Sequence, residues 1–366
     1  LVELLSSVPL EQITIALEKT DTEYTIVESS EDTITLTGPQ GLKYKIKYVP
    51  KERFAFTLFM TTASAGHLEN LKNLGKEILP LKTEEEIYKG LGLDYIPPEL
   101  REGLQEVYWS QKQCIPTLIT FSDLKGALHN HSTYSDGVHT LEQMALYCKD
   151  NLGLEYFGIC DHSKTAVYAH GLPVEKVLEQ WNEITALNEK LAPFKIFKGI
   201  ESDILQDGSL DYDDAILSKF DFVVASIHSN FRMDEQKATE RLITAIENPY
   251  TTILGHPTAR LLLSRAGYPI DYKKVIDACA ANQVVLEINA NPLRLDLDWR
   301  WHQYAISKGV LLSINPDAHR TEGLLDMKYG VHVARKGGLS AKNCLNAFSL
   351  SEIDAFFTKR KAEKMI

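Results

Sequence analysis

The sequence is poor in cysteine and in long apolar runs, and each shortage excludes a class of protein. Its 366 residues include only five cysteines, none arranged as Cys-x-x-Cys, so neither a disulfide framework nor a zinc ribbon is expected. No apolar run approaches the ~20 residues of a membrane span. The opening residues LVELLSSVPLEQ lack the basic region and unbroken apolar core of a signal peptide. We therefore expect a cytoplasmic protein with no membrane partner.

Positive charge is also scarce, since the formal net charge is −11. This balance argues against nonspecific binding of nucleic acid over the whole surface, but it leaves room for a local basic groove. Five basic residues offer such a strip, although a solvated helix face is the simpler explanation for them: Lys72, Lys76, Lys82, Lys89 and Arg101. The length fits about two domains, and the apolar content of 44% is that of an ordinary globular protein.

The first hundred residues predict a small α+β domain. Residues 10–20 have the spacing of a short amphipathic helix. Three β-rich runs separated by turn residues predict a small antiparallel sheet: 23–30, 32–38 and 42–50. Helical patterns follow at 66–75 and 83–90, and Pro97 and Pro98 break the pattern. We expect domains at 1–104 and 124–366, joined by a linker at 105–123.

From residue 124 onward, apolar runs alternate with helical patterns. This alternation predicts a parallel sheet, and seven such units suit a closed α/β barrel better than an open sheet. In such barrels the active site is built at the C-terminal ends of the strands. The residues that follow the apolar runs are therefore the candidates for chemistry.

Metal-type ligands follow six of the seven apolar runs. The candidates are His129, His131, Asp136, His162, Glu201, His228, His256, Asp317 and His319. In an extended segment the side chains of His129 and His131 point to the same side, so both can bind one ion. The seventh run, at 284–292, is expected to contribute only polar amides. Imidazole and carboxylate together suit Zn²⁺, Mn²⁺ or Fe²⁺ rather than Ca²⁺.

Each ligand also has an ordinary structural explanation. A histidine after a strand is more often a surface or capping residue, and His256 before Pro257 is compatible with a turn. Glu201 is compatible with a helix cap, and Asp136 before Gly137 with a turn residue. Together these explanations are less convincing, because a ligand-type residue would have to follow six of the seven predicted strands by chance. Nine convergent ligands are also too many for a single ion.

Seven motifs resemble, in order, those of the polymerase and histidinol phosphatase (PHP) domain: HNHSTYSDG, CDHS, GIESDIL, SIHS, GHPTARLL, EINANPLRLDL and DAH. The resemblance covers about residues 124–360. It is strongest for the PHP domain at the C-terminus of bacterial family X DNA polymerases, which share INANPLRLDL and a segment similar to RKGGLS. It implies a distorted seven-stranded (β/α)7 barrel with three divalent ions, drawn from zinc, manganese and iron.

The resemblance also implies a division of the ligands among the three ions. The first set is His129, His131, Glu201 and Asp317; the second is Glu201, His228 and His256; the third is Asp136, His162 and His319. Glu201 would therefore bridge the first two ions. We assign catalytic roles to Glu201, Asp317 and His319.

The N-terminal region resembles the palm and thumb of the same polymerases. The third palm carboxylate falls at about Lys45, and the Gly-Ser step that meets the nucleotide is Ala63-Ser64. A lysine does not ligate Mg²⁺ as a carboxylate does. The first two carboxylates would precede residue 1, and the chain begins at Leu1 rather than Met. We therefore do not expect this chain to polymerise DNA.

The resemblance implies a metal-dependent phosphoesterase acting on DNA 3′ ends, as a 3′–5′ exonuclease or a 3′-phosphatase. The expected substrate contacts are Arg260, Lys164, His170 and Asn291. A small phosphomonoester, as for histidinol phosphatases, is the alternative substrate. A metal-dependent amidohydrolase is a rival class, although Glu201 fills the bridging role better than Lys198 inside its strand. A non-catalytic DNA-binding remnant of a polymerase is the third alternative, and it predicts a degraded metal site.

Overall fold

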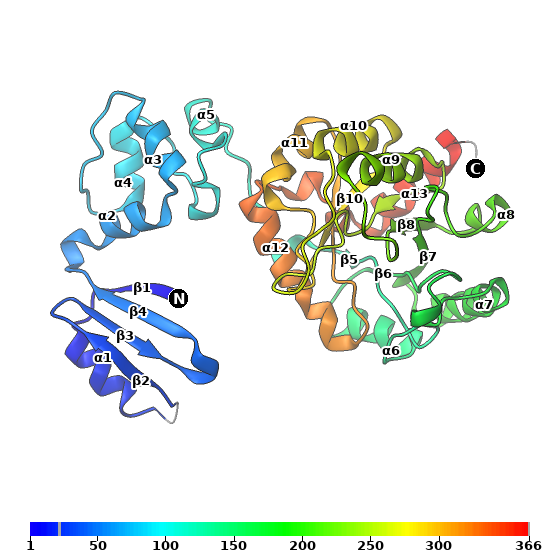
Figure 1. The fold of residues 1–366 in the computed structure, drawn as a ribbon, viewed down its shortest axis with the longest axis horizontal. Coiled ribbons are helices and arrows are strands. Elements are labelled where there is room, and N and C mark those ends of the chain that lie inside the picture. Colours follow the sequence, from blue (N-terminus) through cyan, green and yellow to red (C-terminus); the bar gives the residue numbers. More distant parts are fainter. Residues whose placement is uncertain (21–22, 365–366) are drawn as a thin grey trace. The chain divides into compact units, whose positions relative to one another are not determined.

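The computed structural model describes residues 1–20 and 23–364, and the chain divides into two compact units, Leu1–Ile115 and Pro116–Ile366 (Figure 1). The first unit includes the segment 105–115, within which a short helix forms. No helix in the described part of the chain is both long and apolar enough to cross a membrane.

The first unit begins with a four-stranded sheet of order β1-β4-β3-β2. Its elements are β1 (Val2–Ser6), α1 (Leu10–Leu17), β2 (Thr25–Ser29), β3 (Thr33–Thr37), η1 (Pro39–Gly41) and β4 (Lys43–Tyr48). The expected helix and the antiparallel β2-β3-β4 arrangement are both present. The sequence did not predict β1, which pairs in parallel with β4. Lys45, expected in place of a palm carboxylate, lies in β4.

The rest of the first unit is helical: α2 (Lys51–Thr62), α3 (Ala65–Lys72), α4 (Glu84–Leu91), η2 (Pro98–Leu100) and α5 (Glu106–Gln111). Ser64 and Thr83 cap α3 and α4 by accepting backbone hydrogen bonds, as their side chains favour at helix starts. Helix α2 had no counterpart in the sequence prediction. Phe59 of α2 and Tyr88 of α4 are fully buried, with ring centroids 5.3 Å apart.

The second unit contains a seven-stranded parallel sheet whose order follows the chain from β5 to β11. The strands are β5 (Gly126–Ala127), β6 (Tyr156–Ile159), β7 (Lys195–Asp203), β8 (Phe222–Ser226), β9 (Ile253–Leu254), β10 (Val285–Asn289) and β11 (Leu312–Asn315). A parallel bridge between Asn130 and Ala318 joins the segments that follow β5 and β11. The predicted distorted (β/α)7 barrel is therefore confirmed, as a nearly closed sheet.

Helices surround this sheet (Figure 1). They are α6 (Leu141–Leu146), α7 (Val174–Leu191), α8 (Asp214–Leu217), α9 (Glu235–Glu247), α10 (Tyr272–Asn282), α11 (His302–Ser307), α12 (Met327–Lys336) and α13 (Leu350–Lys364). Short helical turns accompany them: η3 (Phe121–Asp123), η4 (Tyr147–Asn151), η5 (Val167–Ala169), η6 (Trp299–Trp301), η7 (Thr321–Asp326), η8 (Ala341–Asn343) and η9 (Leu345–Ala347).

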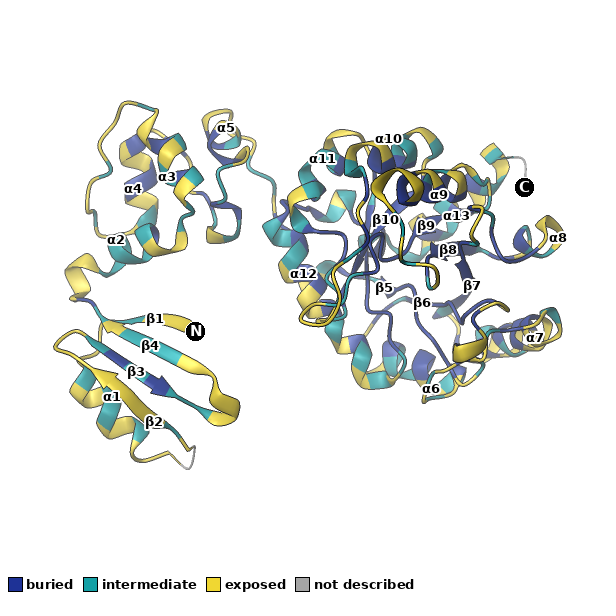
Figure 2. Cartoon of the chain, in the orientation of Figure 1, coloured by how far each residue is buried: buried dark blue, intermediate teal, exposed yellow. Residues whose placement is uncertain are grey.

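One end of the barrel interior is filled by apolar side chains. Phe222, the first residue of β8, stacks on Phe357 of α13 with ring centroids 5.2 Å apart. Cys160 lies in the same buried cluster, and burial raises the pKa of its thiol far above the ordinary range. Figure 2 shows the strands as the buried centre of the unit. The polar chemistry is therefore confined to the opposite, C-terminal ends of the strands.

Candidate metal centre

The nine predicted ligands converge at the C-terminal ends of the strands, around Glu201 in β7. Glu201 Oε1 lies 3.2 Å from His129 Nε2, 3.1 Å from His228 Nε2 and 3.0 Å from His256 Nε2. Its other oxygen, Oε2, lies 2.9 Å from His162 Nδ1 and 3.7 Å from His131 Nε2. One buried carboxylate thus contacts five histidines from four different strand ends.

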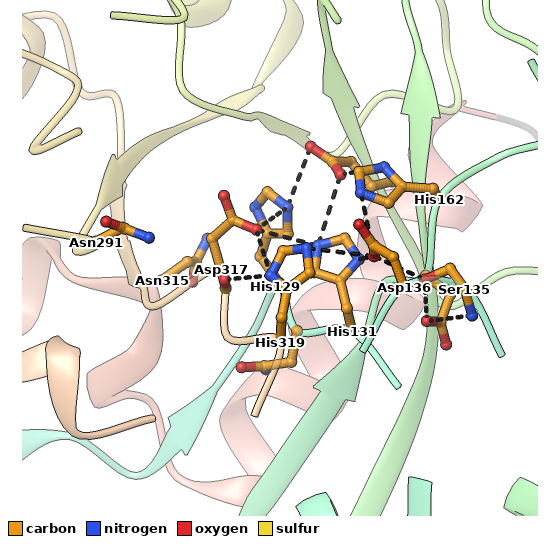
Figure 3. Close-up of polar contacts among 12 residues, drawn as sticks. His129, His131, Ser135, Asp136, His162, Asn291, Asn315, Asp317 and His319 are labelled. Carbon is orange, nitrogen blue, oxygen red and sulfur yellow. Dashed lines mark hydrogen bonds and ion pairs between the residues drawn. The ribbon is translucent and has the colours of Figure 1, made fainter. Parts of the chain in front are cut away.

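The remaining ligands complete the ring on the side of β11. Asp317 Oδ1 is 3.1 Å from His131 Nε2, and Asp136 Oδ1 is 3.3 Å from His319 Nε2. The rings of His131 and His319 stack with centroids 4.1 Å apart. Figure 3 shows these side chains pointing toward one another.

Four overlapping groups of these residues have ligand atoms close enough to share an ion. They are His131–Asp136–His162–His319, His129–Glu201–His256, His129–His131–Asp317 and His162–Glu201–His228. His129, His131, His162 and Glu201 each belong to two groups. The division implied by the resemblance places His162 with Asp136 and His319; here His162 is also within reach of Glu201 and His228.

The backbone at three of these residues adopts a conformation that side chains rarely take. His129, His256 and Asp317 have positive φ, of 59°, 21° and 52°, on the side of the map that glycine favours. Such a conformation costs ~1–3 kcal/mol and persists where the surroundings impose it, as at functional sites. Each of the three lies two residues beyond the end of its strand, so the turn there aims its side chain into the barrel mouth.

The donor atoms fit a metal ion. Five buried side-chain atoms of the cluster make no hydrogen bond to any described residue: His129 Nε2, His131 Nδ1, His162 Nδ1, Glu201 Oε2 and His256 Nδ1. Buried polar atoms are otherwise nearly always hydrogen-bonded, because an unsatisfied one costs ~1–3 kcal/mol. Imidazole nitrogens and carboxylate oxygens are the donors that zinc, manganese and iron accept. The residues present therefore fit divalent ions of this kind.

The electrostatics of the cluster favour bound cations. Burial alone would raise the pKa of Glu201, but His228, His129 and His162 hold it well below its usual range. Burial and the neighbouring rings of His319 and His162 lower the pKa of His131 to about 3. Metals bind the ionised carboxylate and the neutral imidazole. Against the effect of burial, neighbouring carboxylates raise the pKa of His228 to about 10 and that of His319 to about 9, so these two rings would release a proton when an ion binds.

Glu287 of β10 contacts the candidate ligands, and the sequence prediction missed it. Run 284–292 was expected to bring only amides, and this was wrong, because Glu287 Oε2 lies 2.6 Å from Nδ1 of His129. Glu287 is fully buried and also accepts hydrogen bonds from His256 N, Asn289 Nδ2 and Asn315 Nδ2. The sequence feature that could have identified it is a carboxylate inside an apolar strand, because a buried carboxylate is stable only when it has a partner.

Two further carboxylates hold candidate ligands, or the turns that carry them, in position. Asp203 Oδ1 lies 2.6 Å from Nδ1 of His228. Asp161, adjacent to His162, is buried and accepts hydrogen bonds from Ser132, Ser135 and Gln180, which fixes the turn after His131. A carboxylate behind a metal-binding histidine orients the ring and raises its basicity.

The expected substrate contacts lie outside the centre of the cluster. Arg260 donates to the carbonyls of Arg294 and Leu295 and to Asp298 Oδ2, so its guanidinium holds loops together. Lys164 lies 5.5 Å from the Tyr212 ring centroid. His170 is exposed at the end of η5. Asn291 accepts from Leu293 N and stands apart from the histidines in Figure 3.

Two other side chains are closer to the candidate ligands. Arg294 Nε lies 3.5 Å from Asp317 Oδ2, and its Nη1 is buried without a hydrogen bond to any described residue. Tyr168, which is 67% exposed, has its ring centroid 6.1 Å from that of His162 and 6.4 Å from that of His228. Arg294 is thus the cation at the cluster, and Tyr168 is an exposed aromatic ring beside it.

Both units match known protein families. Residues 127–291 match the PHP domain, and residues 40–102 match the DNA polymerase beta thumb. The barrel is thus a PHP domain, and the region before it resembles a polymerase thumb.

The chain as a whole is similar to a bacterial polymerase of the X family. It is 42% identical over 330 residues to the DNA polymerase/3′–5′ exonuclease PolX of Bacillus subtilis (strain 168), covering 86% of this chain and 57% of that protein. The chain therefore spans little more than half the length of that relative.

The barrel region has further relatives. It is 27% identical over 219 residues to a probable phosphatase of Thermoanaerobacter sp. (strain X514), covering 57% of this chain and 84% of that protein. Among solved structures, a histidinol phosphate phosphatase from Lactococcus lactis, complexed with zinc, L-histidinol and phosphate, is 16% identical with a TM-score of 0.44. It covers 59% of this chain and 94% of that chain.

Proposed function

We propose that this chain is a metal-dependent phosphoesterase whose PHP-type barrel acts on the 3′ end of DNA. The observation that carries the proposal is the convergence of nine ligand-type side chains at one barrel mouth, five of them histidines in contact with the buried carboxylate of Glu201. The same cluster leaves five buried nitrogen and oxygen atoms without a hydrogen bond to any residue that the structure describes. A decayed DNA-binding remnant would have no reason to retain such a set.

The residues suit three divalent ions, with the sets His129–His131–Glu201–Asp317, Glu201–His228–His256 and Asp136–His162–His319. When bound, such ions supply Lewis-acid activation of water and of the phosphoryl oxygens. Zinc, manganese and iron all fit the nitrogen and oxygen donors.

The protein contributes positioning and charge. Glu287 orients His129, and Asp203 orients His228, so that the opposite ring nitrogen faces the cluster. Arg294, beside Asp317, places a permanent positive charge where negative charge develops on phosphoryl oxygens. Among the described cysteines, four are buried and Cys114 is exposed outside the barrel, so hydrolysis needs no covalent thiol intermediate.

DNA is favoured as the substrate by the attached thumb-like region and by the similarity to a protein named for 3′–5′ exonuclease activity. A small phosphomonoester is the second candidate. The similarity to the probable phosphatase of Thermoanaerobacter favours this substrate, because the match covers 84% of that protein. Polymerisation is not proposed, because Lys45 stands where a palm carboxylate is expected.

A substrate panel in Mn²⁺ tests the proposal. It contains labelled single-stranded DNA, primed DNA, 3′-phosphorylated DNA and small phosphomonoesters. We expect the unaltered chain to shorten DNA from its 3′ end or to remove its 3′-phosphate. His129→Ala and Glu201→Gln should each lower the rate ~100-fold or more, because each loses a donor at the cluster.

His332→Ala serves as the matched control, because His332 is exposed on α12. It should keep the unaltered rate. Full activity in both His129→Ala and Glu201→Gln would reject the proposed centre. Turnover of small phosphomonoesters without any action on DNA would replace the DNA assignment with the second candidate.

A further inference from the structure

A large hollow adjoins the metal centre and is not used by the proposed hydrolysis. Its volume is about 790 Å³. It is lined by residues that follow β7, β8 and β9 and by the first turns of α9, so it opens at the same end of the barrel as the ligands. Thr258, in its wall, is two residues from His256, and Asn230 is two residues from His228. Two residues span at most ~7 Å, so the backbone of the wall lies within about that distance of the backbone of two candidate ligands.

The hollow is basic in an otherwise acidic chain. Four of its lining residues are cations, namely Arg232, Lys237, Arg241 and Arg265, and none of the lining residues is acidic. The whole chain has a net charge of −11. Asp234 is nearby, but its carboxylate caps α9 by accepting from Lys237 N. A local concentration of positive charge at a phosphoesterase centre attracts a polyanion.

Arg241 supplies charge at the buried side of the hollow. It is 3% exposed, and its guanidinium donates to the carbonyls of Ile204, Leu205 and Ser229. Among the described residues, no carboxylate accepts a hydrogen bond from it. Burial lowers the pKa of Arg241, while Tyr268, Asp203 and Asp207 oppose that shift electrostatically without accepting a hydrogen bond from it. Arg232 and Lys237 are exposed, so their side chains can reach a phosphate in the hollow.

The hollow also offers an aromatic surface. Arg265 Cζ lies 4.3 Å from the centroid of the Phe231 ring, and the rings of Phe231 and Tyr268 are nearly parallel, with centroids 6.4 Å apart. Nucleic-acid bases stack both on aromatic rings and on arginine guanidinium planes. A basic groove that carries a stacking surface is the usual construction of a single-strand binding site.

We propose that this hollow binds the nucleotide next to the 3′-terminal one in single-stranded DNA. Arg232 and Lys237 bind its 5′-phosphate, and the Phe231–Arg265 pair stacks on its base. The terminal nucleotide and the scissile phosphate then lie at the metal centre. This inference rests on the proposed function, because it concerns the same DNA substrate and says where the nucleotide that precedes the cleaved bond is bound.

Binding of DNA tests the hollow without catalysis. All variants carry Glu201→Gln to prevent cleavage, and the full chain is titrated into a 5′-fluorescent single-stranded oligonucleotide while anisotropy is recorded. Arg232→Ala/Lys237→Ala should weaken binding ~10-fold and lower the salt slope by about 0.7–1.4, the value for one or two lost phosphate contacts. Phe231→Leu keeps an apolar side chain but removes the ring, and should weaken binding about 5-fold or more.

Lys219→Ala/Lys359→Ala is the matched control, because it makes the same change in net charge. Both lysines are exposed, Lys219 just before β8 and Lys359 on α13, at the other end of the barrel. The control should keep the affinity and the salt slope of the parent. Parent affinity and slope in Arg232→Ala/Lys237→Ala would overturn the proposal, as would an equal loss in the control.

A kinetic comparison separates this inference from the proposed function. The p-nitrophenyl ester of thymidine 5′-monophosphate carries a nitrophenyl group in place of the penultimate nucleotide. In chains with Glu201 intact, the ratio of kcat/KM for the oligonucleotide to that for this ester should fall ~10-fold in Arg232→Ala/Lys237→Ala. An unchanged ratio would overturn the subsite while leaving the phosphoesterase intact. An unaltered chain that cleaves neither substrate would reject the proposed function itself.

Discussion

Glu287 Oε2 lies 2.6 Å from Nδ1 of His129, and both side chains are fully buried. The contact fixes His129 Nδ1 as the donor, so Nε2 faces Glu201 and the cluster. Burial opposes protonation of His129, but the carboxylates of Glu287, Glu201 and Asp317 outweigh it and raise its pKa well above the ordinary value. The carboxylates of the site therefore attract positive charge, which either a proton on His129 or a bound cation can supply.

The first prediction concerns Glu287→Gln. The substitution keeps the size of the side chain but removes the charge that orients His129. Because such supporting carboxylates are worth ~10–100-fold in metal affinity, we expect zinc or manganese to bind that much more weakly, as measured by competition with a chelating dye. Glu189→Gln, on the exposed face of α7, should leave the affinity unchanged. Unaltered affinity in Glu287→Gln would show that His129 needs no support.

The second prediction contrasts two arginines. Arg294→Ala removes the cation next to Asp317 and should lower kcat/KM by ~10²-fold, as for loss of a group that stabilises developing charge. Arg260→Ala removes hydrogen bonds to two carbonyls and to Asp298. It should mainly lower the free energy of unfolding, by ~1–3 kcal/mol, and the melting temperature with it. Steady-state kinetics and thermal unfolding of both variants measure the difference. The reverse pattern would make Arg260 the phosphate-binding residue.

The third prediction concerns metal removal. A ligand that binds only the folded state at 100 times its Kd stabilises by ~2.7 kcal/mol, which corresponds to about 5–10 °C for a unit of this size. We expect calorimetry to record a loss of this order for the barrel transition after chelation, and its recovery with Mn²⁺ or Zn²⁺. A barrel transition that is insensitive to chelator would mean that the cluster does not hold ions in the folded chain. His129→Ala should show a smaller response than the unaltered chain.

The barrel could be predicted because its signals are local. Apolar runs of strand length alternate with helical spacing, and a ligand that follows a strand is placed at the mouth by the strand-end rule alone. Glu287 could not be placed this way, since its role depends on His129, far away in the sequence. Arg260 and Arg294 differ in the residues that surround them in the folded loops. The sequence pattern does not contain this information, so it could not show which arginine lies beside the candidate ligands.

The first unit illustrates the same limit. Strands β2, β3 and β4 were predicted because their turns are encoded in adjacent residues. Strand β1 was missed because its partner, β4, lies some forty residues later and pairs with it in parallel. Helix α2, with the sequence KERFAFTLFMTT, was missed because its apolar residues run almost continuously from Phe54 to Met60 and so show no helical period.

The last prediction concerns the buried network of the thumb-like region. Glu106 Oε1 lies 2.7 Å from His67 Nδ1 and accepts from Gly103 N, while Oε2 accepts from Leu104 N. Burial alone would raise the pKa of Glu106, but the hydrogen bonds from His67 and the backbone outweigh it and lower the pKa below the ordinary value. The ionised form is therefore the one that stabilises the fold.

Because the folded pKa is depressed, this stabilisation is fully present above the unfolded value of ~4.3. It is lost as the pH falls through the folded value. Glu106→Gln should lose ~1–3 kcal/mol at neutral pH and should show a shallower loss of stability below pH ~4. Hydrogen-exchange protection factors of α3 and α5 in the full chain, corrected for intrinsic rates, measure both effects. Glu69→Gln, exposed on α3, should follow the unaltered chain at every pH. Equal pH profiles for Glu106→Gln and the unaltered chain would mean that another group governs acid unfolding of this unit.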